Sequence, residues 1–366
     1  MMKSKKELSL KRKMLNNQIF FSVFNNTTNS YKFFWWLSII EICNQNDSEI
    51  ISFDEIVFKI ISKLWYPVNF FKISFGKIDK CSKYVKQIQG KYNLADNISE
   101  ADLYDFLIDH RDSDFLVKIT DELTKYVPYR FIRPWFNQET RGLKDGLVNS
   151  KIIELQNESA PYVIDLSCNK IKINAKWFDW IKTNYSILKT STNFYLLKHL
   201  EKENPNVTSL SIKLERPKYR NLSTQTKYWK SYILKEPKVI SVFENKLLSE
   251  LNEISIDHFF PWSFVTHDLI WNLHPVTKNV NSSKNNILPN KKYFTKFHSL
   301  QFSFCKHLLN NNSSKPLENY YNLFKCSNDE LKNLSYECFV KKMDDFYLPQ
   351  FELAKNMGFG IGWKLS

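Results

Sequence analysis

The segment at 254–289 constrains the fold of this chain more than any other stretch. A short apolar run ends there in the pair Asp257-His258, and a loop interrupted by a proline follows it. Because proline lacks a backbone N–H, this loop cannot continue a strand ladder. A second short stretch with a strand pattern covers 271–276, and a polar stretch at 279–286 stops before another proline. This order predicts strand, loop, strand and helix on one compact platform.

The polar residues of this segment suit the hydrolysis of a phosphodiester. Histidine titrates near neutral pH, so His258 is a candidate base that takes a proton from water. A hard divalent cation prefers carboxylate and amide oxygens, such as those of Asp257 and Asn281, and would neutralise charge on the phosphate. A neighbouring asparagine, Asn272, could hold the histidine in place. A turn-capping role for Asp257 and a helix N-cap role for Asn281 are the structural alternatives.

In these residues the segment resembles the HNH (ββα-metal, or His-Me finger) endonuclease family. The family motif has Asp-His at the end of a first strand, Asn on the second strand and His or Asn on the helix. Asn272 follows His258 by fourteen residues and Asn281 follows it by twenty-three, separations similar to those in the HNH domain of RNA-guided CRISPR effector nucleases. The helix start Asn281-x-x-Lys284 and the closing Leu-Pro pair at 288–289 also match the commoner form of the motif.

The resemblance implies a role for each matched residue. His258 and Asn272 would be the catalytic residues, with His258 activating water and Asn272 positioning His258 or its loop. Asp257 and Asn281 would hold one Mg²⁺ or another divalent metal ion, and the products would carry 5′-phosphate and 3′-hydroxyl ends. Many family members also bind structural zinc through paired cysteines. None of the six cysteines here belongs to a C-x-x-C pair, so we expect no structural zinc and expect aromatic packing in its place.

Positive charge indicates a polyanionic partner. The net charge is +14, although the lysine-rich composition also reflects a bias expected of an AT-rich genome. The segment 213–238 interleaves cations with aromatic residues, which suits a nucleic-acid groove; a solvated linker and helix is the alternative. We expect Lys284 to face the phosphate backbone and His274 to lie behind the metal ligands or face DNA. The candidate nucleic-acid-binding residues are Lys218, Arg220, Lys227, Lys230, His274 and Lys284.

The rest of the chain predicts mostly helices. Only seven glycines occur in 366 residues, which argues against Gly-rich nucleotide loops and turn-rich β folds. Helix-capping sequences begin apolar periodic stretches at 52–55, 99–102 and 327–330, whereas 161–173 reads as a short hairpin. The last of these sequences predicts a helix through about Lys342, and the glycines at 358–362 predict a turn-rich chain end. The stretch 126–136 contains two prolines and is therefore not expected to form a regular helix; packing between helices is favoured there over a nucleic-acid surface.

We therefore expect a mainly α protein with a small embedded ββα-metal (HNH) module, α+β overall. The predicted domains are a helical N-terminal domain at 1–212 for DNA or partner recognition, a basic connector with the HNH module at 213–290, and a C-terminal helical extension at 291–366. The longest apolar run, 33–43, is about half a membrane span, and no signal-type cleavage pattern follows the basic start. The sequence thus predicts a cytoplasmic protein with no membrane contact.

The predicted function is metal-dependent endonuclease cleavage of DNA, with bacterial defence or restriction as the role suggested by analogy. One alternative is a non-cleaving DNA-binding protein with a degenerate finger, and another is an RNA-cleaving effector. RNA therefore stays open as a substrate. An ungated nuclease would endanger its host, so a regulatory protein or guide partner is a hypothesis as well. His267 and Asp268 are interpreted as loop structure.

Overall fold

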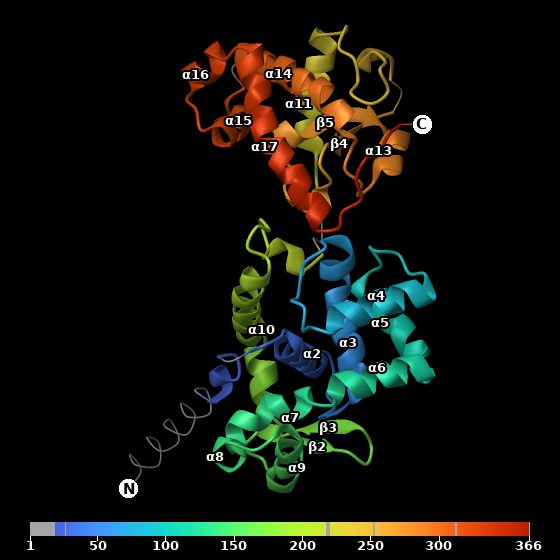
Figure 1. The fold of residues 1–366 in the computed structure, drawn as a ribbon, viewed down its shortest axis with the longest axis vertical. Coiled ribbons are helices and arrows are strands. Elements are labelled where there is room, and N and C mark those ends of the chain that lie inside the picture. Colours follow the sequence, from blue (N-terminus) through green and yellow to red (C-terminus); the bar gives the residue numbers. More distant parts are fainter. Residues whose placement is uncertain (1–18, 26, 217–219, 252, 312, 366) are drawn as a thin grey trace. The chain divides into compact units, whose positions relative to one another are not determined.

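A computed structural model describes residues 19–25, 27–216, 220–251, 253–311 and 313–365. The chain forms two compact units, 1–215 and 216–366 (Figure 1). Within the described residues the fold is mainly helical, with one sheet of three strands and one of two. The predicted fold class is therefore confirmed.

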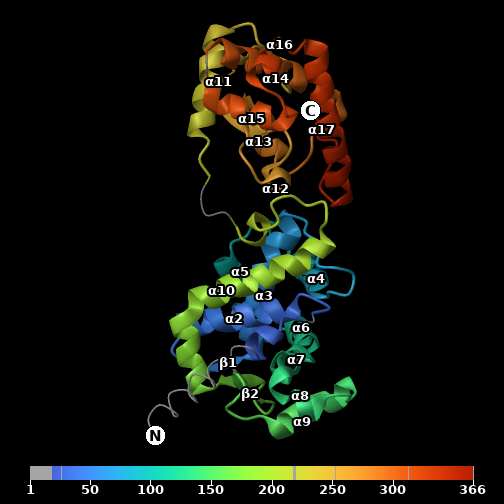
Figure 2. The same cartoon turned by 90° about the vertical axis from the view of Figure 1, so that its left-hand side faces the viewer.

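The N-terminal unit is built around α2, which packs against both α10 and α3 (Figure 1, Figure 2). Two predicted helix starts are confirmed: the Glu55 carboxylate accepts a hydrogen bond from Ser52 N at 2.8 Å, and the Ser99 hydroxyl accepts one from Asp102 N at 3.0 Å. The helices are α2 (Tyr31–Gln45), α3 (Phe53–Trp65), the π-helical η1 (Tyr66–Phe70), α4 (Cys81–Tyr92), α5 (Glu100–Asp109), α6 (Asp114–Thr124), α7 (Val127–Ile132), the 3₁₀ helix η2 (Arg133–Phe136), α8 (Asn137–Thr140), α9 (Asp145–Leu155), α10 (Ala175–Glu203) and the 3₁₀ helix η3 (Ile212–Leu214).

The predicted hairpin is confirmed and carries a third strand. Strands β2 (Tyr162–Asp165) and β3 (Lys170–Ile173) pair antiparallel, and β1 (Ile50–Ser52) pairs antiparallel with the other edge of β3. Strand β1 was not predicted, because three residues are too few to show the alternation that identifies a strand.

The aromatic stretch 126–136 is more helical than predicted. It forms α7 and η2, and each helix has its proline in the first turn. The missing N–H costs no hydrogen bond there, because the first N–H groups of a helix have no partner within it. The Phe131 ring stacks on Trp36 at a centroid distance of 5.1 Å, which agrees with the predicted packing role.

The C-terminal unit surrounds the paired strands β4 (Ile254–His258) and β5 (Leu273–Thr277) with helices. Residues after 290 join the same hydrophobic core as the strands, and α14 packs against α15 and α17 (Figure 1, Figure 2). The helices are α11 (Ser223–Lys235), η4 (Leu248–Glu250), α12 (Trp262–Val265), η5 (Ile270–Asn272), α13 (Lys278–Lys284), η6 (Lys291–Tyr293), α14 (Phe294–Asn310), α15 (Ser314–Phe324), α16 (Asn328–Asn333) and α17 (Tyr336–Asn356), where each η is a 3₁₀ helix.

Two details of this unit differ from the sequence-based expectation. The capping box at Ser327 is present, but its helix ends at Asn333 instead of near Lys342, and the Ser335 hydroxyl caps a new helix, α17. The chain end, expected only to turn, returns to the module: Leu288 N donates to Gly360 O at 2.8 Å. In the described part of the chain, no helix is long and apolar enough to cross a membrane.

The core of the C-terminal unit supplies a stability prediction. Trp229 on α11 is fully buried and stacks on Phe304 at 3.8 Å. We expect Trp229→Ala to lower the free energy of unfolding by about 3–5 kcal/mol, as measured by urea unfolding followed by circular dichroism. Leu234 on the same helix is 83% exposed, so Leu234→Ala is the matched control and should change the stability by at most about 0.5 kcal/mol. Equal losses in both variants would contradict this account of the core.

Candidate active site

Strands β4 and β5 place the candidate residues side by side. They pair antiparallel, with Asp257 opposite His274 and His258 opposite Leu273. Helix α13 follows β5 directly, and the Thr277 hydroxyl caps it by accepting a hydrogen bond from Val280 N. The predicted order of strand, loop, strand and helix is thus observed. Asn272 lies at the end of η5, one residue before β5 begins.

His258 is held by a carboxylate from the loop that follows it. Its Nε2 lies 2.8 Å from Oδ1 of Asp268. A carboxylate can only accept a hydrogen bond, so Nε2 carries the hydrogen and Nδ1 keeps its lone pair. Among the described residues Nδ1 has no hydrogen-bond partner. Unlike both ring nitrogens of His274, it is not fully buried. Nδ1 is therefore the atom of His258 that can accept a proton from water.

Asp268 is charged in this contact. Burial raises the pKa of its carboxyl, but the hydrogen bond with His258, the charge that His258 carries when it is protonated, and the charges of Arg220 and His267 lower it more. The net result is a pKa below the usual range of aspartate. A charged carboxylate on Nε2 fixes the ring orientation and stabilises the imidazolium that forms when Nδ1 takes a proton.

Asp257 and the buried Lys284 form an ion pair at the end of β4. Lys284 Nζ lies 3.0 Å from Asp257 Oδ2 and donates to the carbonyl oxygen of His258 at 2.7 Å. The other carboxylate oxygen, Oδ1, accepts a hydrogen bond from His258 N at 2.7 Å. The Lys284 side chain is 0% exposed. One cation therefore both neutralises Asp257 and fixes the backbone that carries His258.

Asn281 lies beside the same face of β4 as Asp257. Its Nδ2 donates to the Ser255 hydroxyl at 2.9 Å, and residues two apart on a strand share a face. The amide oxygen of Asn281 has no hydrogen-bond partner among the described residues. Asn281 lies inside α13, whose N-cap is Thr277, so the helix-cap alternative does not apply.

These two oxygen donors fit a hard divalent cation. Oδ2 of Asp257 is buried and makes no hydrogen bond besides its ion pair with the Lys284 ammonium, and Asn281 offers an amide oxygen. Mg²⁺ is commonly bound through one or two protein oxygens, together with water and substrate phosphate. The described residues contain no group of three or more His, Cys, Asp or Glu placed to hold a metal ion. A cation at Asp257 would therefore need phosphate or water oxygens, and it would compete with the Lys284 ammonium.

Asn272 acts on the loop and makes no hydrogen bond with the His258 ring. Its amide oxygen accepts from Phe260 N at 3.0 Å, and its amide nitrogen donates to Phe260 O at 2.9 Å. The Tyr347 hydroxyl on α17 lies 3.1 Å from the same amide oxygen. Asn272 is fully buried. Its contacts make it a positioning residue for the loop that follows His258.

Two predicted nucleic-acid-binding residues lie in the interior. Lys284 is enclosed by the contacts described above. His274 is 0% exposed and lies against the rings of Phe243, Phe259 and Phe297, at centroid distances of 4.8, 5.9 and 5.5 Å. A side chain with no exposed surface cannot touch a phosphate in this conformation. The burial of Lys284 and His274 therefore argues against direct contacts with DNA.

The other predicted nucleic-acid-binding residues are differently placed. Lys227 and Lys230 are exposed and lie three apart on α11, so they share a face of that helix. Arg220 is exposed as well, and its guanidinium lies 4.8 Å from the Trp262 ring centroid. Lys218 lies outside the described residues. Three of the six predicted nucleic-acid-binding residues are thus exposed cations and stay candidates for phosphate contacts.

Two contacts of the candidate site, made by Asp268 and by Tyr347, were not predicted from the sequence. Asp268 was interpreted as loop structure, because a loop that brings a residue back to a side chain ten positions earlier shows no periodic pattern in the sequence. Thr266, with a φ of 55° in the left-handed region, helps to turn this loop. Tyr347 is separated from Asn272 by 75 residues, and no local signal connects positions so far apart.

The burial of His274 supplies a pH prediction. Burial, together with the positive charges of Lys284 and His258, holds the pKa of His274 well below the usual value. In the unfolded chain this group binds a proton below about pH 6.5, so the folded state loses stability as the pH falls below that value, by up to about 1.4 kcal/mol per pH unit. We expect His274→Leu to reduce this slope, as measured by urea unfolding at pH 7.5, 6 and 5.

The control for that variant is His267→Gln, which removes a half-buried histidine outside the core. It should leave most of the slope in place. An unchanged slope in His274→Leu would show that His274 is not held neutral.

Comparison with known proteins identifies this segment. Residues 242–290 match the profile of the HNH endonuclease family. No curated protein and no solved structure matches the chain. The family match indicates nuclease activity with nucleic acid as the substrate class, and HNH nucleases generally use a divalent metal ion. The C-terminal half of this chain therefore contains an HNH endonuclease domain.

Proposed function

We propose that the chain is a metal-dependent endonuclease that hydrolyses phosphodiester bonds of DNA, with His258 as the general base. The observation that carries this proposal is the contact between His258 Nε2 and Asp268, which leaves Nδ1 as the proton acceptor. Water that loses its proton to Nδ1 can attack the phosphorus atom. General-base catalysis of this kind contributes roughly 10²–10⁴-fold to a rate.

We propose Asp257 and Asn281 as the protein ligands of the metal ion, with Mg²⁺ as the first candidate. A bound divalent cation supplies Lewis-acid stabilisation of the charge that develops on the phosphate and the leaving oxygen. The support is chemical: Asp257 and Asn281 present a carboxylate oxygen and an amide oxygen next to the same strand face. Lys284 adds a positive charge 3.0 Å from Asp257, so the carboxylate is neutralised before a metal ion binds.

DNA is the proposed substrate and RNA the alternative within the same chemistry. Support for a nucleic acid duplex comes from Lys227, Lys230 and Arg220, whose exposed charges can pair with phosphates. Cleavage is favoured over binding alone because Asp257, His258, Asn272 and Asn281 are all present. A degenerate finger would carry an apolar residue at position 257 or 258. A role in bacterial defence rests on analogy, and control by a partner protein rests on the danger that an ungated nuclease poses to its host; both stay predictions.

The test of the proposal is plasmid cleavage with and without Mg²⁺. Wild-type protein should nick or cut supercoiled DNA only when Mg²⁺ is present. His258→Ala should lose about 10²-fold or more of the rate, because the proton acceptor is gone. Relaxed and linear products are followed on a gel at equal protein concentrations.

The control is His110→Ala, which removes an exposed histidine of the N-terminal unit and should cleave like wild type. Cleavage by His258→Ala at the wild-type rate would overturn the assignment of the base. Metal-independent cleavage would overturn the metal requirement. A labelled RNA of the same sequence, run in parallel, decides between the two substrates.

Asp268 gives a second prediction for the same reaction. Asp268→Asn keeps the size of the side chain and removes the charge that stabilises the imidazolium. A hydrogen bond to a charged group contributes about 1.5–3 kcal/mol, so we expect kcat to fall roughly 10- to 100-fold with little change in KM for DNA. Asp345→Asn, at an exposed aspartate on α17, is the matched control. A rise in KM at constant kcat would place Asp268 in DNA binding instead.

A further inference from the structure

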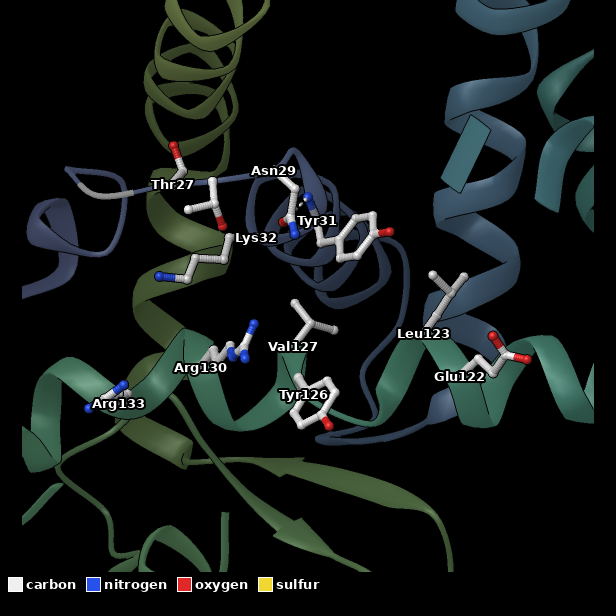
Figure 3. Close-up of a pocket in the computed structure, with 11 residues that line it drawn as sticks. Thr27, Asn29, Tyr31, Lys32, Glu122, Leu123, Tyr126, Val127, Arg130 and Arg133 are labelled. Carbon is white, nitrogen blue, oxygen red and sulfur yellow. Dashed lines mark hydrogen bonds between the residues drawn. The ribbon is translucent and has the colours of Figure 1, made fainter. Parts of the chain in front are cut away.

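The N-terminal unit contains a pocket of about 200 Å³ that the nuclease chemistry does not use. It lies between the start of α2 and the segment that runs from α6 through α7 into η2 (Figure 3). Liquid water occupies about 30 Å³ per molecule, so the pocket can hold a group several times the size of water. Its size suits a phosphate with part of an attached sugar or ring.

Three cationic side chains line one part of this pocket. Figure 3 shows Lys32 from α2 facing Arg130 from α7 and Arg133 from η2, whereas Glu122 lies apart from them with Leu123. Three like charges in one pocket repel each other unless an anion lies among them. The pKa of Lys32 reflects this: burial lowers it, and the charges of Arg130 and Arg133 lower it further.

Two of the three cations lack a carboxylate partner among the described residues. Lys32 Nζ reaches only the carbonyl oxygen of Val23, at 3.5 Å. Arg133 donates to the carbonyl oxygen of Thr140 at 2.9 Å. Arg130 does pair with Asp145, which is not part of the pocket lining. Positive charge in the pocket is therefore only partly compensated by the protein.

The neutral lining groups are compatible with a phosphorylated ligand. The lining includes Thr27, Thr28 and Asn29, whose side chains can donate hydrogen bonds to phosphate oxygens. Tyr126 also lines the pocket; it is 37% exposed, and its ring centroid lies 4.7 Å from the Arg130 guanidinium. Exposed aromatic rings of this kind stack on nucleobases.

We propose that this pocket binds the phosphate monoester of a nucleotide, held by Lys32 and Arg133 and flanked by Tyr126. A phosphate monoester carries a charge of about −1.5 to −2 at pH 7, which matches several cations better than a carboxylate or a phosphodiester would. The guanidinium fork of arginine pairs with two phosphate oxygens at once. The ligand is either a free nucleotide or the phosphorylated end of a nucleic acid strand, since both present the same group.

The test is isothermal titration of the full chain in metal-free buffer with EDTA, so that no cation bridges phosphate to Asp257. The probes are adenosine 5′-monophosphate, adenosine, and a short oligothymidylate with and without a 5′-phosphate. We expect the phosphorylated member of at least one pair to bind more tightly than its unphosphorylated partner. Lys32→Gln should weaken that binding about tenfold or more, and Lys32→Arg should restore it.

The matched control is Lys86→Gln, at an exposed lysine on α4 outside the pocket lining, which should bind like wild type. Binding of the mononucleotide identifies a free nucleotide as the ligand, and binding of the phosphorylated oligonucleotide alone identifies a strand end. Equal binding of phosphorylated and unphosphorylated probes overturns the proposal, as does wild-type affinity in Lys32→Gln. Neither result bears on His258, whose role is tested by plasmid cleavage.

Discussion

The two hydrogen bonds between the Asn272 side chain and the backbone of Phe260 fix the path of the chain just after His258. An amide side chain carries a separate donor and acceptor, so it can donate to a carbonyl and accept from an N–H of one residue at the same time. The contact is fully buried, so leaving either backbone group unpaired would cost about 1–3 kcal/mol. Tyr347 lies close enough to occupy the remaining acceptor position of Asn272, which connects α17 to the candidate active site.

Aromatic packing against α14 and α17 stabilises the loop after His258. The Phe259 ring stacks on Phe297 of α14 at 3.8 Å, and the Phe260 ring meets Tyr347 of α17 at 4.8 Å. Aromatic pairs contribute about 0.5–1.5 kcal/mol beyond the area they bury. Helices α14 and α17 thus belong to the support of the β4–β5 platform, which is why residues beyond 290 share its core. Without α14 and α17 the loop after His258 would lose these ring contacts.

The order of the secondary-structure elements could be predicted from local sequence, whereas the long-range contacts could not. The Asp-His pair, the proline in the loop and the polar stretch after 278 predict the order of elements, because each is a local signal. Asp268 escaped prediction because its contact with His258 depends on how the intervening loop turns. Lys284 was predicted to face phosphate since lysine is usually exposed. Its burial follows from Asp257, whose charge lies 3.0 Å away and requires a partner in the interior.

The buried and the exposed cations of the C-terminal unit have different roles, which the net charge alone does not distinguish. Lys284 is enclosed and acts on Asp257 and the His258 backbone, so its charge is not available to pair with phosphate. Lys227, Lys230 and Arg220 are exposed and can release counterions from DNA. Each phosphate contact lowers the slope of log K against log salt by about 0.9. The buried pair of Lys284 and Asp257 adds nothing to the net charge of +14, so the number of phosphate contacts depends on the exposed cations and not on the total count of lysines and arginines.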